Sequence, residues 1–200
     1  MSMQRKSIAT MGFMIALFCA FACTQTVVTP IPQTVRRIAV LPPYQPGVTD
    51  TRSESYNAVP GLPSRTISEL IGEQARARLT ERGFDVLEPS VVKLASNNRV
   101  PTSPEMAAQI ARQANLDAAV LYIEILRWQS TPYDRGMKAD GVIVALGATL
   151  IDPKTGAVLW QVRRPSRPVP VYGDMLTGQA NVFVAETVTR EIFGSREPRG

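Results

Sequence analysis

Arg-Arg-Ile-Ala-Val-Leu-Pro-Pro, residues 36–43, is the stretch that decides the fold. Its centre, Ile38 to Leu41, is aliphatic and lacks the polar alternation of a strand with one wet face, so it predicts an interior strand buried on both faces. Pro42 and Pro43 lack amide protons and therefore end the hydrogen-bonding ladder. The rest of the chain must supply neighbouring strands and covering helices for this segment.

The segment that follows predicts a βαβ unit. Residues 42–63 are irregular and rich in proline, and Ser64 is expected to cap a helix whose apolar residues recur at helical spacing up to Leu79. Gly83 is expected to close that helix in a left-handed conformation. Phe84 to Glu88 then forms a second short strand, parallel to the first and reached by a right-handed crossover.

The second half of the chain predicts an antiparallel meander. A short helical turn at 89–95 and a helix begun by Ser103 and Pro104 precede strands at 118–129, 141–151 and 157–163. A basic, proline-rich connector at 163–174 and a final amphipathic helix at 172–193 complete the pattern. The expected fold is α/β (α+β): a mixed sheet with an N-terminal βαβ unit and a C-terminal antiparallel meander, with helices packed on the sheet.

The N-terminus has the pattern of a signal peptide that precedes a lipidated cysteine. Arg5 and Lys6 come before an uncharged apolar run, Ile8 to Phe21, that is too short to span a bilayer. The run ends in Ala-Phe-Ala-Cys at 20–23, which resembles the lipobox of bacterial lipoproteins. That resemblance implies cleavage before Cys23 and diacylglycerol and N-acyl chains (such as palmitate) on Cys23. The alternative is an ordinary signal peptide whose cut happens to precede a cysteine.

These boundaries divide the chain into four parts. We expect a signal peptide at 1–22, a lipidated N-terminus and linker at 23–35, a single periplasmic α/β domain at 36–194 and a flexible tail at 195–200. The domain has enough residues for one good core.

Composition excludes several classes of site. The chain has no histidine, and its two cysteines, Cys19 and Cys23, both lie in the signal peptide or at its cleavage site. Ser-His and Cys-His nucleophile systems and the usual nitrogen ligands of zinc are therefore absent from the sequence. The formal charge of +5 suits a protein beside anionic headgroups, and no aromatic residues are interleaved with the arginines as nucleic-acid binding requires. We expect no metal, no nucleic acid and no cofactor beyond the acyl chains.

Carboxylates are candidate catalytic groups, because an enzyme that hydrolyses cell-wall glycans needs a pair of them. Asp50 and Glu54 share the long loop, and Asp134 and Asp140 flank the first hairpin turn. None has a fixed spacing on a rigid element, so we interpret them as solvated charges. Asp152, Thr155, Gly156 and Trp160 are interpreted as a turn and a packed tryptophan rather than as a site.

Two groups of residues are candidate partner contacts. Tyr44 and Tyr56 lie in the irregular 42–63 segment, which is either a functional loop or a disordered insertion. Arg163, Arg164 and Arg167 alternate with prolines and are suited to an acidic partner, or else form a solvated edge connector.

Four stretches carry a resemblance to a known group of proteins. They are Arg-Ile-Ala-Val-Leu-Pro at 37–42, L-T-E-R-G-F at 79–84, A-N-L-D-A-A-V-L-Y at 114–122 and L-I-D-P-K-T-G-A-V-L-W at 150–160. Together they resemble the envelope lipoproteins related to CsgG, LpoB and the TolB N-terminal domain, including the small GNA-type lipoproteins, over residues 35–193. The resemblance implies an α/β sandwich and a non-enzymatic role in protein contacts at the outer membrane. The long amphipathic hairpins of the CsgG barrel have no counterpart here.

Three functions follow as hypotheses. The preferred one is a non-enzymatic lipoprotein, anchored to the outer membrane and facing the periplasm, that acts as an adaptor or accessory subunit of a secretion, transport or wall-assembly complex. The second is a ring-forming subunit of a CsgG-like secretion apparatus, with homo-oligomeric contacts. The third is a carboxylate-based hydrolase of cell-wall glycans.

Overall fold

A computed structural model describes residues 30–46, 65–130, 141–171 and 177–194. The elements in chain order are β1 (Arg37–Val40), α1 (Ile67–Glu81), β2 (Asp85–Val86), α2 (Pro89–Ala95), α3 (Pro104–Gln113), β3 (Ala119–Ser130), β4 (Val142–Ile151), β5 (Val158–Val169) and α4 (Thr177–Phe193).

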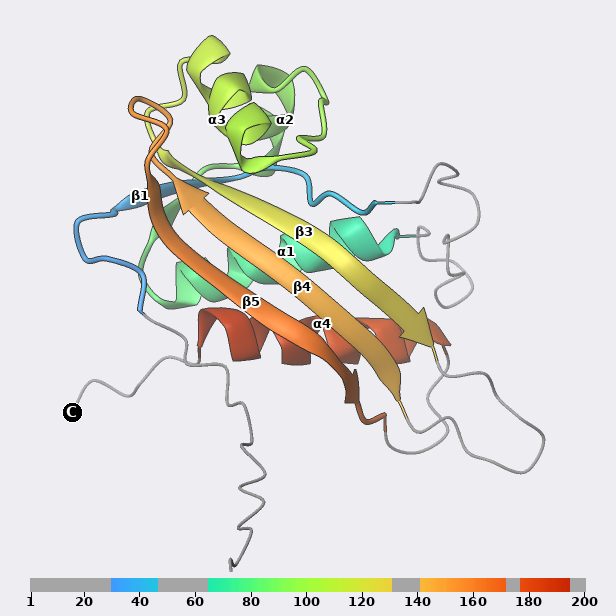
Figure 1. The fold of residues 1–200 in the computed structure, drawn as a ribbon. Helices are drawn as coiled ribbons and strands as arrows, with labels where there is room; N and C mark the ends of the chain where they lie inside the picture. Colours follow the sequence, from blue (N-terminus) through green and yellow to red (C-terminus); the bar gives the residue numbers. More distant parts are fainter. Residues whose placement is uncertain (1–29, 47–64, 131–140, 172–176, 195–200) are drawn as a thin grey trace, which may run out of the picture.

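The strands form one mixed sheet in the order β2-β1-β3-β4-β5 (Figure 1). β1 pairs in parallel with β2 on one side and with β3 on the other, where Val40 lies opposite Leu121. β3, β4 and β5 are antiparallel neighbours. The predicted fold class, with its βαβ unit and its meander, is confirmed, and 36–43 does supply an interior strand.

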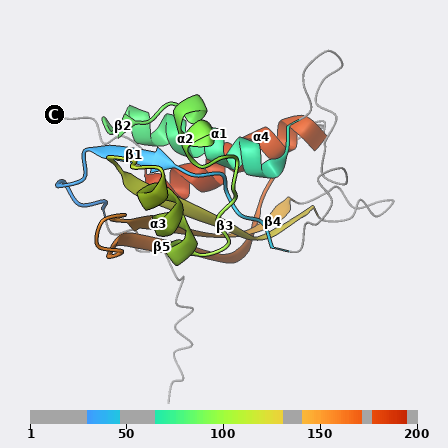
Figure 2. The ribbon, with the colours of Figure 1, turned by 90° about the horizontal axis from the view of Figure 1, so that it is seen from above.

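Two hydrophobic clusters cover the two faces of the sheet. On one face, α1 and α4 lie side by side and pack on Val40, Leu121 and Leu146. On the other face, α2 and α3 pack on Ala39 and Val120, near β1 and β3. Figure 2 shows α1 and α4 along one side of the sheet. The parallel half of the sheet is therefore covered on both faces, as buried parallel strands require.

The first helix begins two residues later than the sequence analysis placed it. Thr66, not Ser64, is the N-cap: its hydroxyl accepts a hydrogen bond from the Glu69 amide, and the Glu69 carboxylate accepts one from the Thr66 amide. This reciprocal pair is a capping box, which satisfies two amides that the helix itself leaves free. The other predicted helix ends are confirmed: Ser103 caps α3, and Gly83 after α1 has a positive φ. Asn115 after α3 and Gly194 after α4 also have positive φ.

The last strand is longer than predicted. Residues 163–169, expected to be a connector, continue β5 through Pro165 and Pro168. β5 is the edge strand, so a proline there need not donate to a further strand. The register with β4 also shifts between Val144 and Leu146, which is a bulge that accommodates one extra residue of β5.

The core extends N-terminal to the predicted domain boundary. Ile31 and Val35 are 4% and 8% exposed and belong to the cluster beneath α1 and α4. Part of the segment expected to be linker thus packs on the domain. Among the described helices, none has the length and apolar character to cross a bilayer.

Candidate functional site

The structure places the predicted partner-contact residues in different environments. Cys23 and Tyr56 lie outside the described residues. Tyr44 is half-buried and extends the sheet beyond β1: its amide donates to the Ile123 carbonyl at 2.8 Å, and its carbonyl accepts from the Ile125 amide at 2.7 Å. Its backbone therefore has a structural role, and a partner contact by its ring stays a prediction.

The three arginines of β5 are not equivalent. Arg163 is exposed and Arg167 is half-buried, so both are accessible to a partner. Arg164, however, is 1% exposed; its guanidinium donates to Glu191 of α4 at 2.7 Å and to the carbonyls of Val144 and Arg167. It cross-links β5 to α4 inside the protein, and in this structure it is not the surface contact that the sequence suggested.

Glu191 is the counter-charge of this cluster. It also accepts a hydrogen bond from Arg167 at 2.8 Å. Burial raises the pKa of Glu191, but the hydrogen bonds and positive charges of Arg164 and Arg167 outweigh burial, so its pKa lies below the usual value. The carboxylate is therefore held in its charged form, and the cluster is a structural ion pair.

The Asp152 turn has the structural role that we expected. Asp152 accepts hydrogen bonds from the Lys154 amide and the Thr155 hydroxyl, and Gly156 has φ +78°. Hydrogen bonds from Thr155 and Lys154 lower the pKa of Asp152. Trp160 is buried against Phe193 with ring centroids 5.9 Å apart.

The other carboxylates considered as catalytic groups are not placed by the structure. Asp50, Glu54, Asp134 and Asp140 lie outside the described residues. In the part of the chain that is described, no three Asp, Glu, His or Cys side chains lie close enough together to hold a metal ion.

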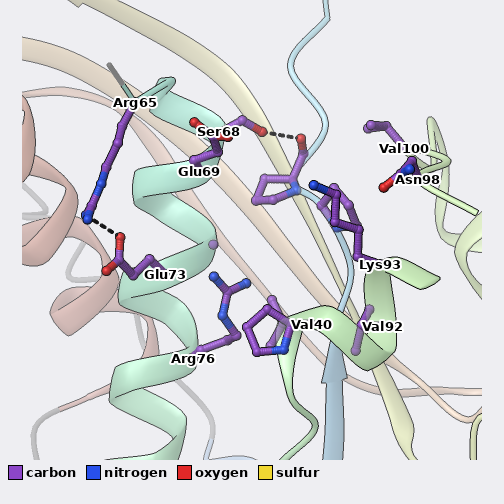
Figure 3. Close-up of a pocket in the computed structure, with 14 residues that line it drawn as sticks. Val40, Arg65, Ser68, Glu69, Glu73, Arg76, Val92, Lys93, Asn98 and Val100 are labelled. Carbon is purple, nitrogen blue, oxygen red and sulfur yellow. Dashed lines mark hydrogen bonds and ion pairs between the residues drawn. The ribbon is translucent and has the colours of Figure 1, made fainter. Parts of the chain in front are cut away.

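A cleft of about 790 Å³ lies between α1 and α2. Figure 3 shows its walls: α1 supplies Glu73 and Arg76, Arg65 lies just before the N-cap of α1, and α2 supplies Val92 and Lys93. The volume is within the usual range of ligand pockets. We take this cleft as the candidate functional site.

The cleft lies where β1 ends and its two covering helices diverge. Val40, Pro42 and Pro43 form an apolar floor, and Ser68 of α1 donates a hydrogen bond to the Pro43 carbonyl. Gly72 permits this close approach, because a Cβ there would lie 3.2 Å from the Pro43 ring. In sheets with parallel strands, ligands bind at such carboxyl ends, between helices that leave on opposite faces.

The charges of the cleft are only partly paired. Arg65 donates to Glu73 at 2.6 Å, and the Glu69 carboxylate is occupied by the capping box. The side chains of Arg76 and Lys93 form no ion pair and no hydrogen bond with the described residues. Burial lowers the pKa of Arg76, and the more distant charges of Glu73 and Glu88 oppose this effect without cancelling it. The cleft thus presents positive charge above an apolar floor, which suits an anion with an apolar part.

Sequence reasoning did not find Arg76 or Lys93. Arg76 lies among the polar residues of an amphipathic helix, and Lys93 belongs to a short helical turn with no motif. The available signal was the proline stop at Pro42, which marks the carboxyl end of a parallel strand, where a crevice is expected.

Comparison with known proteins identifies similar folds but no family. No protein-family model and no curated protein matches the chain. Among solved structures, lipoprotein GNA1162 from Neisseria meningitidis is 20% identical, with a TM-score of 0.44, covering 78% of this chain and 96% of that one. The PelC dodecamer from Paraburkholderia phytofirmans is 16% identical, with a TM-score of 0.44, covering 87% and 96%. The LpoB C-terminal domain from Salmonella enterica is 13% identical, with a TM-score of 0.37, covering 70% and 86%.

The solved structures similar to this chain thus include a bacterial lipoprotein. The CsgG and TolB parts of the resemblance noted in the sequence stay predictions. The identities and TM-scores are too low to assign a family or a function, so the proposals below rest on the chain's own residues.

Proposed function

We propose that this chain is a lipoprotein of the bacterial envelope, anchored by acyl chains on Cys23, that acts as a non-enzymatic accessory subunit of an envelope complex. The observation that carries the proposal is Cys23 itself, which directly follows Ala-Phe-Ala and a short apolar run preceded by Arg5 and Lys6. A transmembrane helix would need a longer run.

The structure sets how far such an anchor would let the domain move. Ile31 is already part of the core, so the free tether would consist of residues 24–30. At about 3.5 Å per residue, these seven residues would reach roughly 25 Å when fully extended. The domain would then work close to the membrane that holds it. Thr24 is not the aspartate that retains some lipoproteins at the inner membrane, so we propose the periplasmic face of the outer membrane.

The anchoring is tested by Cys23→Ser with Cys19→Ser as the matched control. The Cys23 variant should lose labelling by radioactive palmitate, while the Cys19 variant should be labelled and fractionate like the unmodified chain. Undiminished labelling and membrane fractionation of the Cys23 variant would contradict the proposal.

The accessory role is tested by the native mass of the detergent-extracted chain with its co-purifying proteins identified. An accessory subunit should be recovered with one or two other chains in fixed ratio. PelC forms a dodecamer, so a large homo-oligomer is the competing outcome, and it would favour the ring-forming subunit instead. Release of sugars from purified cell wall would contradict a non-enzymatic role.

A further inference from the structure

The cleft between α1 and α2 adjoins a second, smaller pocket with an exposed apolar residue. Lys93 and Asn98 line both pockets, and Leu94, which lines only the second, is 84% exposed. Val100, which lines the cleft itself, is 44% exposed. Scattered apolar side chains at a surface are ordinary, but Val100 borders a concave site with an apolar floor and Leu94 lies in the pocket beside it. The combined surface is longer than the cleft alone.

Arg76 gives this surface a charge preference. Its guanidinium is half-buried beside Gly72 and the Pro43 ring, and no described carboxylate pairs with it. A charged group that loses water without gaining a partner costs free energy. A carboxylate that entered the cleft would recover that cost through charge-assisted hydrogen bonds, which a guanidinium forms in pairs. Lys93, on the opposite wall, would add a second attraction (Figure 3).

The acidic residues of the cleft do not satisfy these cations. Glu73 pairs with Arg65, and Glu69 holds the N-cap of α1. A ligand with both charge and apolar surface therefore fits better than a simple anion, because the floor formed by Val40, Pro42 and Pro43 offers no hydrogen bonds from side chains. An extended peptide supplies both, since its side chains can alternate between the floor and the charged walls.

We propose that this cleft binds a short acidic and apolar peptide segment of a partner protein. An Asp or Glu side chain of the segment lies between Arg76 and Lys93, one apolar side chain packs on the floor, and a second packs on Leu94 and Val100. The inference rests on the proposed accessory function and deepens it, because it identifies the surface by which the chain holds its partner.

The experiment is selection of phage-displayed random 12-residue peptides on the purified full-length mature chain in non-ionic detergent. The consensus peptide is then synthesised with a fluorescent label and its affinity measured by anisotropy. We expect an acidic residue beside apolar ones, and a loss of affinity of about 10-fold or more with Arg76→Gln, the scale of one hydrogen bond to a charged group. Lys93→Gln should cost less, about 2- to 5-fold, because Lys93 is exposed.

Two matched controls separate the cleft from general effects. Arg112→Gln removes an exposed cation from α3, and Val182→Ser removes an exposed apolar side chain from α4, whereas Leu94→Ser alters the pocket beside the cleft. Only the Leu94 variant should weaken binding. A synthetic peptide with Asn or Gln in place of its acid should bind the unmodified chain weakly and be insensitive to Arg76→Gln.

Several results would overturn the inference. They are a selection that yields no binding peptide, a consensus without an acid, and affinities that Arg76→Gln and Lys93→Gln leave unchanged. Binding of phosphatidylglycerol vesicles that needs Arg76 while peptides do not bind would assign the cleft to lipid instead. Peptide affinity does not depend on the lipid anchor, so the two proposals can fail separately. If the chain is not lipidated but binds peptide, only the proposed anchoring is contradicted. If the chain is lipidated but binds no peptide, only the proposed role of the cleft is contradicted.

Discussion

Arg164 offers the sharpest test of how the edge strand is held, because it is charged and yet 1% exposed. Its guanidinium joins β5 to Glu191 of α4 and also caps the Val144 carbonyl of β4. We consider Arg164→Met, which keeps the length of the side chain and removes its charge and its donors.

The expected loss of folding stability depends on the groups that Arg164→Met leaves without a partner. Removal of one partner of a buried ion pair costs about 3–5 kcal/mol when the other partner is left without compensation. Here Glu191 is 35% exposed and keeps Arg167, so it is partly compensated. Met also replaces the packing of the Arg164 stem. We therefore expect a loss of about 2–3 kcal/mol, below the range for a fully buried pair.

The assay is urea unfolding of the Cys23→Ser chain, followed by the fluorescence of its tryptophans, of which Trp160 is buried near α4. With a slope of about 2 kcal/mol per molar urea, the midpoint should fall by about 1–1.5 M. Arg167→Met is the control: Arg167 is 38% exposed and shares the same carboxylate, so its loss should cost only about 0–1 kcal/mol. If the two variants had equal midpoints, the reasoning about burial would be refuted.

Two further predictions follow from the same structure. The pKa of Glu191 is lower in the folded than in the unfolded chain. Its contribution to stability is therefore fully present above the unfolded pKa and is lost as pH falls through the folded pKa. In the Glu191→Gln variant, the urea midpoint should fall less below about pH 4.5 than it does in the unmodified chain. An unchanged acid profile in that variant would contradict the assignment. Gly156→Ala should cost about 1 kcal/mol, since φ is +78° but no atom lies near, whereas Gly141→Ala should cost at least twice as much, because its Cβ would lie 2.1 Å from the Val169 carbonyl oxygen. Equal thermal midpoints for the two alanine variants would show that this contact is not rigid.

Local signals made most of the fold predictable. The aliphatic run before Pro42 identified an interior strand, and Ser103 with Pro104 fixed the start of α3, because caps depend only on residues a few positions apart. Thr66 was missed in favour of Ser64, although the spacing from Thr66 to Glu69 is itself the sequence signature of a capping box. That boundary could have been predicted.

Tertiary position explains what the sequence could not reveal. Pro165 and Pro168 argued against a strand, and they are tolerated only because β5 has no further neighbour in the sheet. In the sequence, Arg164 looks like the other arginines of a basic stretch. Its ion pair with Glu191, which lies 27 residues later in the chain, is visible only in the folded structure. The cleft likewise forms because α1 and α2 lie on opposite faces of β1, and neither helix contains a sequence motif that would predict it.

The two halves of the sheet present different surfaces to a partner protein. The outer face of β5, with Gln161 and Arg163, is polar and can remain in water, as one face of an antiparallel sheet commonly does. The cleft at the parallel half instead holds a half-buried guanidinium without a described partner, above an apolar floor. Covering the polar face would cost desolvation and gain little, whereas filling the cleft would pair a charge and bury apolar area together. Association at the cleft is therefore more favourable than association at the polar face. Even a partner that contacts Arg163 would gain affinity by placing an acidic segment beside Arg76.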